Sequence, residues 1–336
     1  ATAHTLPRRL PRRRPFQICP TPPSPPPAPP GAGRGGAPGA PPRAPATGSL
    51  ADRAVAAARD ADAVVFIGGL NHDYDAEGSD RPDLKLPGGQ DALIERLLEA
   101  NPHTIVTLIA GAPVEMPWAD RAPAIVWTGY LGMEAGRALA DVLLGRVNPG
   151  GKLPYTLPAR IEDNPAHHPD GGTCGRDRVE YREGIFVGYR WHDARGIAPR
   201  FPFGHGLSYT TFDYRDLRVD RAGLPDGVLA RVRCRVANTG PRAGAEVAQL
   251  YVGDDESDLP RPPRELKAFR KVRLEPGAEA ELVFDLGAEA FRYWRPERDG
   301  WVIEPGGFTI AVGASSRDLR LTGRLELDTE TAGGAL

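Results

Sequence analysis

Three apolar runs decide the fold of the first half of the chain: AVVFIGG at residues 63–69, TIVTLIAG at 104–111 and AIVWTGY at 124–130. Continuous runs of this length, rich in β-branched residues, are typical of strands buried on both faces of a parallel sheet. Helical patterns alternate with them at residues 51–62, 90–100 and 132–145. This alternation predicts an α/β domain with a mostly parallel sheet and crossover helices.

The hydrophobic period changes to two after about residue 208. The run VLARVRCRVAN at 228–238 alternates apolar residues with arginines, which predicts an antiparallel strand with one wet face. Similar short runs follow at 246–253, 267–274, 280–286, 301–304, 308–313 and 319–327, separated by turn signals. About seven such strands predict a β-sandwich of the immunoglobulin or fibronectin type III kind.

The first 50 residues differ from the rest of the 336-residue chain. They hold 15 of the 36 prolines and seven arginines but no acidic residue, so we expect a disordered leader. Since the whole chain has a net charge of −2, the remainder is acidic, which disfavours a nucleic-acid partner. No apolar run is long enough for a membrane span, and no signal peptide is evident, so the expected location is cytoplasmic.

Motifs for cofactors and metals are not evident in the sequence. The stretch IGGLNHD after the first apolar run is not GxGxxG, and FGHGLSY lacks the spacing of a nucleophile elbow. The three cysteines form no CxxC, and the seven histidines form no HExxH. We therefore expect neither a cofactor nor a metal site.

The loop at 71–88 is dense in acidic residues and follows the first buried strand. Ligand sites of open α/β sheets gather at the carboxyl ends of strands. One acid in such a cluster can be held protonated by the charge of its neighbours and then act as a proton donor. Glu77 precedes Gly78, which lets the chain bend or approach a ligand closely. The alternative is a hydrophilic loop in which Asp80 pairs with Arg81.

Five separated stretches resemble glycoside hydrolase family 3, whose members are mostly retaining β-glucosidases. They are AEGSDRPDLKLPGGQDALIERL (76–97), NPHTIVTLIAGAPVEMPW (101–118), LLGRVNPGGKLPYTLP (143–158), YREGIFVGYRWHD (181–193) and FPFGHGLSYTTFDY (201–214). The usual plan of the family is a (β/α)8 barrel, then an α/β sandwich, then often a fibronectin type III-like domain. The resemblance covers residues 51–325, which implies that this chain matches the last two parts.

The resemblance also implies roles for individual residues. Glu77 matches the catalytic acid/base of the family, and Tyr74 falls where relatives carry an aromatic residue near the aglycone. Motif residues Tyr181 and Tyr189 are expected to pack between domains, and residues 204–206 to form the turn into the third domain. Trp118 and Trp127 are expected in the core.

Retaining glycosidases need two carboxylates about 5–5.5 Å apart. The family's nucleophile is an aspartate on the barrel, commonly in an SDW motif, and no SDW occurs in these residues. We therefore expect a β-glucosidase-like glycosidase that is inactive alone, with a β-linked glucoside or related oligosaccharide as substrate and a separate barrel chain as a partner. A sheet without the family's earlier strands is also expected to leave an unpaired edge before residues 63–69.

Two other interpretations remain open from the sequence. One is a non-catalytic carbohydrate- or partner-binding module that uses Tyr251, Tyr293, Trp294 and Trp301. The other is a decayed fragment. The expected domains are a leader at 1–50, an incomplete α/β sandwich domain at 51–208 and the β-sandwich at 209–330.

Overall fold

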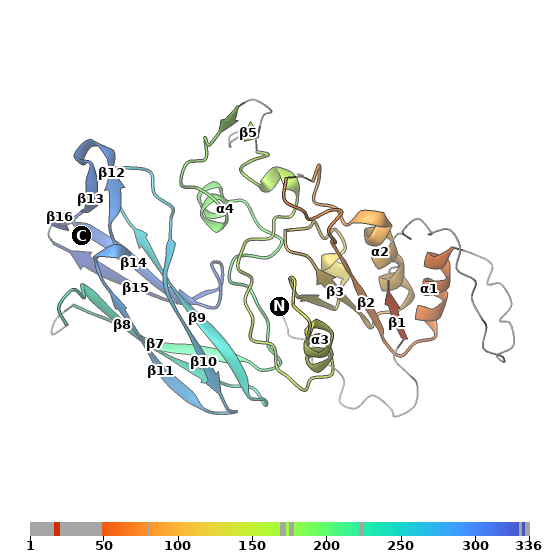
Figure 1. The fold of residues 1–336 in the computed structure, drawn as a ribbon. Coiled ribbons are helices and arrows are strands. Elements are labelled where there is room, and N and C mark those ends of the chain that lie inside the picture. The colour runs from red at the N-terminus through yellow and green to blue at the C-terminus, as the bar shows by residue number, and fades with distance from the viewer. Residues whose placement is uncertain are drawn as a thin grey trace, which may run out of the picture. The chain divides into compact units, whose positions relative to one another are not determined.

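The chain folds into two compact units, Ala1–Ala135 and Gly136–Leu336. The computed structural model describes residues 17–20, 49–78, 81–168, 173–174, 178–221, 225–328 and 331–332. A parallel sheet with helices forms the first unit, and antiparallel sheets dominate the second (Figure 1). The predicted fold class, α/β followed by a β-sandwich, is confirmed. Within the described residues, no helix is long and apolar enough to cross a membrane.

A four-stranded parallel sheet organises the first unit. Its strands are β1 (Gln17–Pro20), β2 (Val64–Gly69), β3 (Thr104–Ile109) and β4 (Ala124–Trp127), in that spatial order. The three predicted strands are therefore confirmed. The expected unpaired edge of β2 is wrong, because β1 satisfies the backbone groups along it. The rest of the predicted leader, 1–16 and 21–48, lies outside the described residues.

Two helices cover one face of this sheet. They are α1 (Leu50–Arg59) and α2 (Gln90–Ala100), which pack against each other. Successive parallel strands added in one direction through right-handed crossovers place both helices on the same face, as Figure 1 shows. Phe66 of β2 and Ile94 and Leu97 of α2 are completely buried in the resulting core. The apolar stripe expected at 90–100 is thus the packing face of α2.

Polar contacts fix the two ends of α1. The Ser49 side chain accepts a bond from the Asp52 N–H, and the Asp52 carboxylate accepts one from the Ser49 N–H, forming a capping box. The same carboxylate pairs with Arg96 of α2 at 2.6 Å. At the other end, buried Asn101 donates to the carbonyls of Ala58 and Ala61 at 2.9 and 2.7 Å. These contacts set the position of α1 against α2.

We predict that the Asp52 contacts make stability depend on pH. The bonds from Arg96 and Ser49 lower the pKa of Asp52 from 3.8 to about 2. The stabilising contribution is therefore complete above pH 3.8 and is lost as the pH falls through about 2. Urea unfolding of wild type and Asp52→Asn should differ at pH 6 and converge near pH 2. Arg96→Met should remove most of the same dependence, and a constant difference from pH 6 to pH 2 would contradict the assignment.

The second unit contains the β-sandwich. Its main strands are β7 (Phe212–Asp220), β8 (Ala230–Asn238), β9 (Gly244–Asp254), β10 (Glu265–Leu274), β11 (Glu279–Leu286), β14 (Gly306–Gly313) and β15 (Leu319–Leu327). One sheet has the order β10-β9-β14-β15 and the other β11-β8-β7, with all neighbours antiparallel. Side chains from both sheets form one core, which includes Val232, Leu250, Phe284 and Ile310. The predicted β-sandwich is therefore confirmed, with four described strands in one sheet and three in the other.

One of the runs predicted to be a sandwich strand belongs to another sheet, and another segment takes its place in the sandwich. The run at 301–304 belongs to β13 (Gly300–Ile303), which pairs with β12 (Tyr293–Arg295) and β16 (Thr331–Ala332) in a separate small sheet. The missing strand is β7, which pairs with β8. Its register shifts between Arg215 and Arg218, and Asp216 has a φ of 58°. This bulge breaks the period-two pattern by which strands are recognised.

Strand β8 confirms the expected wet and dry faces. Its alternating residues Ala230, Val232, Cys234 and Val236 are buried. Two arginines between them pair with acids on the neighbouring strand β11: Arg231 with Asp285 at 2.5 Å, and Arg235 with Glu279 at 2.8 Å. Burial raises the pKa of the Cys234 thiol to about 11, so the thiol stays protonated at neutral pH.

Shorter elements precede the sandwich or interrupt it. Helix α3 (Ala135–Leu143) begins at the boundary of the two units, and α4 (Tyr189–Arg195) follows the small strands β5 (Thr173–Cys174) and β6 (Val179–Glu180). Single 3-10 turns are η1 (Pro87–Gly89), η2 (Ala119–Arg121), η3 (Ile161–Asp163), η4 (Ala288–Ala290) and η5 (Pro296–Arg298). Helix α4 was not predicted from its motif.

Two of the five stretches that resemble the family are hydrogen-bonded to each other in the second unit. The stretch at 143–158 runs beside the one at 201–214, with backbone bonds from Leu153 to His205 and from Gly204 to Leu153 at 2.8 Å. Gly204 has a φ of +78°, and a Cβ there would lie 2.0 Å from the Gln249 side chain. The expected turn at 204–206 is therefore present and requires glycine. Between the motif and β9, the buried pair Lys152–Glu246 closes at 2.8 Å.

Helix α4 also packs on the sandwich. The Tyr189 hydroxyl accepts a hydrogen bond from the Leu266 N–H of β10 at 2.8 Å, and its ring stacks on Phe203. Asp193 is buried between Arg264 and Arg317, at 3.3 and 2.5 Å. Tyr189 therefore packs as its motif predicts, whereas Tyr181 is 77% exposed.

We predict that removal of the Lys152 charge destabilises the second unit. Lys152→Met leaves the Glu246 carboxylate buried without its partner, which costs about 3–5 kcal/mol in such sites. Denaturant unfolding followed by near-UV circular dichroism measures this cost. Arg273→Met is the matched control, because Arg273 pairs with Glu275 at 3.9 Å in solvent and should change stability by less than about 1 kcal/mol. Equal effects of the two substitutions would contradict the prediction.

Candidate functional site

The loop that carries Glu77 leaves the carboxyl end of β2, as predicted. Its first part, residues 70–78, is described, but Ser79 and Asp80 are not, so the expected Asp80–Arg81 pair lies outside the described residues. The Glu77 side chain is exposed, and it is followed by Gly78 with a φ of +80°. Tyr74, the other predicted site residue, is 45% exposed on the same loop. The structure thus brings both onto one surface loop.

The start of the loop is fixed to α2. The Gly69 N–H donates to the Gln90 side-chain oxygen at 2.8 Å, and the Gln90 amide donates back to the Gly69 carbonyl at 2.9 Å. A Cβ on Gly69, which has a φ of +139°, would lie 1.9 Å from the Ile109 carbonyl oxygen. The loop therefore leaves the sheet from a closely packed point that requires glycine.

A turn at Asn71 then bends the chain. The Asn71 side-chain oxygen accepts a bond from the Asp73 N–H at 3.0 Å. Its carbonyl accepts bonds from the N–H groups of Tyr74 and Asp75, at 3.0 and 2.9 Å. Asparagine favours such turns because its side chain replaces a backbone acceptor. This turn therefore fixes the backbone at Tyr74 and Asp75 relative to Asn71.

Asp75 joins three loops at the carboxyl edge of the sheet. Its Oδ2 accepts a hydrogen bond from the Gly111 N–H, after β3, at 3.1 Å. It also accepts one from the Tyr130 hydroxyl, after β4, at 2.8 Å. We call Asp75, Gly111 and Tyr130 the Asp75 clamp. Sequence reasoning noted Asp75 only as one acid among several and missed the other two; the available signal was that each follows a parallel strand.

The Tyr130 ring lies close against Gly111 although it is 55% exposed, and its hydroxyl remains a donor. A Cβ on Gly111 would lie 2.6 Å from the Tyr130 ring and 2.9 Å from Asp75 Oδ2. Burial and then the hydrogen bond and charge of Asp75 raise the pKa of Tyr130 above its ordinary value. Because Asp75 accepts two bonds through one oxygen, its carboxylate acts as an anchor for the loop.

The second part of the loop is anchored through polar contacts to residues after β3. Arg81 Nη2 donates to the Pro113 carbonyl at 2.6 Å. Asp91 of α2 accepts bonds from the Leu86 N–H at 3.1 Å and from Trp118 Nε1 at 2.8 Å. Burial raises the pKa of Asp91 despite these bonds. Trp118 is completely buried, which confirms its expected place in the core.

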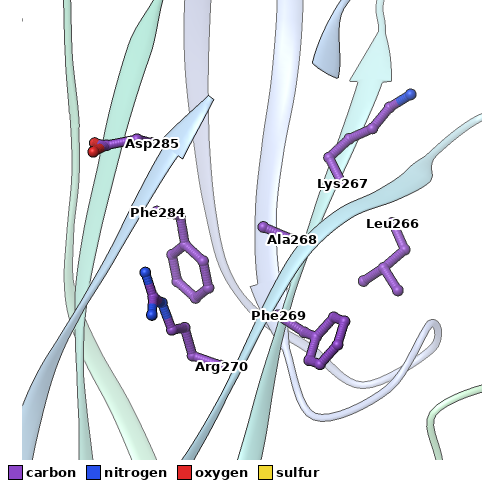
Figure 2. Close-up of a pocket in the computed structure, with 7 residues that line it drawn as sticks. All are labelled: Leu266, Lys267, Ala268, Phe269, Arg270, Phe284 and Asp285. Carbon is purple, nitrogen blue, oxygen red and sulfur yellow. The ribbon is translucent and has the colours of Figure 1, made fainter. Parts of the chain in front are cut away.

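Concave surfaces are found in the second unit. A pocket of about 310 Å³ lies between β10 and β11, and Figure 2 shows Phe284 and Arg270 between the two strands while Lys267 points away. Another, of about 720 Å³, includes Asp163 and His168. Neither includes a residue of the 71–88 loop. In the described part of the chain, no group of three or more potential metal ligands comes together.

The aromatic residues proposed for a binding module are divided by the structure. Tyr251 is completely buried, and its hydroxyl donates to Gln249 at 2.6 Å. Trp294 and Trp301 face each other across β12 and β13, with ring centroids 5.7 Å apart, and each is nearly half exposed. Arg292 lies over the Trp301 ring, 5.0 Å from its centroid. Only this cross-strand pair therefore retains substantial exposed aromatic surface among the four residues.

Two domain families match the chain. Residues 37–209 match the Glycosyl hydrolase family 3 C-terminal domain, and residues 246–316 match the Fibronectin type III-like domain. The first match spans more than half of the chain. This protein belongs to glycoside hydrolase family 3 and is β-glucosidase-like, which confirms the resemblance read from its motifs.

Two relatives of the chain are named as β-glucosidases. The chain is 46% identical over 273 residues to thermostable beta-glucosidase B of Acetivibrio thermocellus, covering 81% of this chain and 36% of the relative. It is 45% identical over 278 residues to beta-glucosidase BoGH3A of Bacteroides ovatus, covering 82% and 37%. The chain therefore spans about a third of the length of these relatives.

Solved structures share the same fold. The beta-glucosidase from Kluyveromyces marxianus in complex with glucose aligns with a TM-score of 0.79 and 38% identity, covering 84% of this chain and 34% of that one. DesR, a beta-glucosidase from Streptomyces venezuelae in complex with D-glucose, aligns with a TM-score of 0.78 and 36% identity, covering 83% and 35%. Both units thus have counterparts in β-glucosidase structures.

We predict that Gly111→Ala breaks the clamp. The added methyl group displaces the Tyr130 ring, and overpacking of this kind costs about 1–3 kcal/mol. Thermal unfolding measures the cost, and spectrophotometric titration of the tyrosines should show one phenol shifted toward its ordinary pKa. Gly132→Ala is the control, because a Cβ there meets no atom within 4 Å. A wild-type titration in Gly111→Ala would contradict the packing argument.

Proposed function

We propose that Glu77 is the general acid/base of a retaining β-glucosidase reaction. The observation that carries the proposal is its place in the family motif, on a loop at the carboxyl edge of the sheet that polar contacts fix on both sides. In the first step the protonated Glu77 gives its proton to the glycosidic oxygen as the aglycone leaves. In the second step its carboxylate takes a proton from the water that attacks the glycosyl–enzyme intermediate.

The nucleophile of this proposal lies outside the described loop. Asp75 is the nearest described acid along the chain, but its carboxylate is held by Gly111 and Tyr130. In the family plan an aspartate of the (β/α)8 barrel attacks the anomeric carbon. We propose that residues 1–336 act on a β-glucoside together with such a barrel and turn over little substrate without it. Tyr74 is proposed to contact the aglycone, since its exposed ring lies on the same loop.

We predict a specific activity pattern once a barrel is supplied. All 336 residues are joined to the part of the Acetivibrio thermocellus enzyme that they do not match. In this chimera Glu77→Ala should lower the rate on methyl β-glucoside by about 100-fold or more, because a poor leaving group needs the proton. The rate on 2,4-dinitrophenyl β-glucoside should fall less, and azide should restore turnover of this activated substrate.

The control for this experiment is Glu99→Ala. Glu99 lies exposed on α2, where it pairs with Arg121, so its loss should leave both rates unchanged. The 336-residue chain without the barrel should show no Glu77-dependent release of p-nitrophenol from p-nitrophenyl β-glucoside. Full activity of the Glu77→Ala chimera on methyl β-glucoside would refute the assignment.

A further inference from the structure

We propose that Asp75 is a positioning residue, which holds Glu77 in place by tying its loop to Gly111 and Tyr130. This inference rests on the proposed function of Glu77. The contacts are direct: Asp75 Oδ2 accepts the Gly111 N–H at 3.1 Å and the Tyr130 hydroxyl at 2.8 Å. Hydrogen bonds to an ionised carboxylate are about twice as strong as neutral ones. The Asp75 clamp therefore links the first part of this loop to the segments after both β3 and β4, whereas the Arg81–Pro113 bond links its second part to the segment after β3.

Both partners of Asp75 are themselves fixed to the sheet. Gly111 lies two residues after the end of β3, where the Ile109 carbonyl accepts the Leu70 N–H at 2.9 Å. Tyr130 follows Thr128, whose N–H donates to the Leu108 carbonyl at 3.0 Å. Backbone hydrogen bonds of this kind at strand ends make local opening of the chain less frequent. The clamp thus ties the loop to chain that is hydrogen-bonded to the sheet.

The restraint reaches Glu77 through only two peptide units. Consecutive Cα atoms are about 3.8 Å apart, so the Cα of Glu77 stays within roughly 7–8 Å of the Cα of Asp75. On the other side the next anchor is Arg81, which donates to the Pro113 carbonyl. Without the Asp75 anchor, the chain between the Asn71 turn and Arg81 has no described side-chain contact to another loop. Gly78, with no side chain to pack, adds no restraint of its own.

The chemistry explains why the restraint affects the reaction. A general acid must lie within hydrogen-bond reach of the oxygen that it protonates. A displacement of about 1 Å at a reacting group can reduce the rate about 100-fold. A tyrosine with an ordinary pKa is protonated at neutral pH, and burial and Asp75 raise the pKa of Tyr130 further, so the clamp keeps its hydroxyl donor at neutral pH.

The first test measures the clamp on the full 336-residue chain labelled with 15N-glycine. Among the described groups, Asp75 is the acceptor of the Gly111 amide, so Asp75→Ala should speed hydrogen exchange at Gly111 by at least about 10-fold. Asp75→Asn should retain much of the protection, because its side-chain oxygen can accept both bonds. Asp73→Asn is the matched control: among the described residues the Asp73 carboxylate accepts a bond from Asn71, so this substitution should leave exchange at Gly111 unchanged.

The second test uses the barrel chimera to separate positioning from folding. Asp75→Ala should lower kcat on methyl β-glucoside by about 10- to 100-fold while KM changes less than about 3-fold. The rate on the activated dinitrophenyl substrate should fall less, because this substrate needs no proton in the first step, and azide should restore the part of that rate that depends on Glu77 as a base. Asp75→Asn should restore most of the lost rate on methyl β-glucoside. A loss that is equal on both substrates would show general damage and overturn the positioning role.

The two arms distinguish the two proposals. Unchanged Gly111 exchange in Asp75→Ala overturns the clamp whatever Glu77 does. If exchange at Gly111 depends on Asp75 but Glu77→Ala leaves the activity of the chimera unchanged, the clamp itself stands. The acid/base role of Glu77 and the proposal that Asp75 positions Glu77 are then both overturned. Loss of the poor-leaving-group rate in both Glu77→Ala and Asp75→Ala, with recovery in Asp75→Asn, supports both proposals.

Discussion

Parallel pairing of β2, β3 and β4 is the constraint on which the candidate site depends. Because the three strands run in one direction, their following loops emerge at one edge. A single carboxylate, that of Asp75, can then accept bonds from two of these loops while it belongs to the third. The site therefore depends first on the common direction of the strands, and only then on the individual side chains. The helices α1 and α2 support it by covering one face and fixing the start of the loop through Gln90.

Much of the architecture could be predicted from hydrophobic patterns. Helix α2 was expected at 90–100 and spans Gln90–Ala100, and β8 shows the alternation read from its arginines. Strand β7 was missed because the bulge at Asp216 interrupts its period. Strand β1 was missed because it lies in a stretch whose composition favours disorder, and its pairing depends on the free edge of β2. In both cases a tertiary contact overrides the local pattern.

The candidate site was predictable only in part. The loop and its place after β2 follow from sequence order and composition, whereas the roles of Glu77 and Tyr74 came only from the family resemblance. The clamp could not be read from the sequence, because Asp75 and Tyr130 are 55 positions apart in the chain and meet only when the sheet forms. Gly111 was equally hidden: a glycine after a strand is ordinary, and the reason for it is the ring and the carboxylate that a methyl group would strike.

The Lys152–Glu246 pair has a consequence for where this chain can be divided. Lys152 comes from the stretch before the sandwich, and Glu246 comes from a strand within it. Transfer of the sandwich alone to another protein would separate Glu246 from the cation that pairs with it and from the stretch that packs beside the start of β9. A segment of this chain that keeps the pair together therefore begins at or before Lys152, some sixty residues before the first sandwich strand, at Phe212.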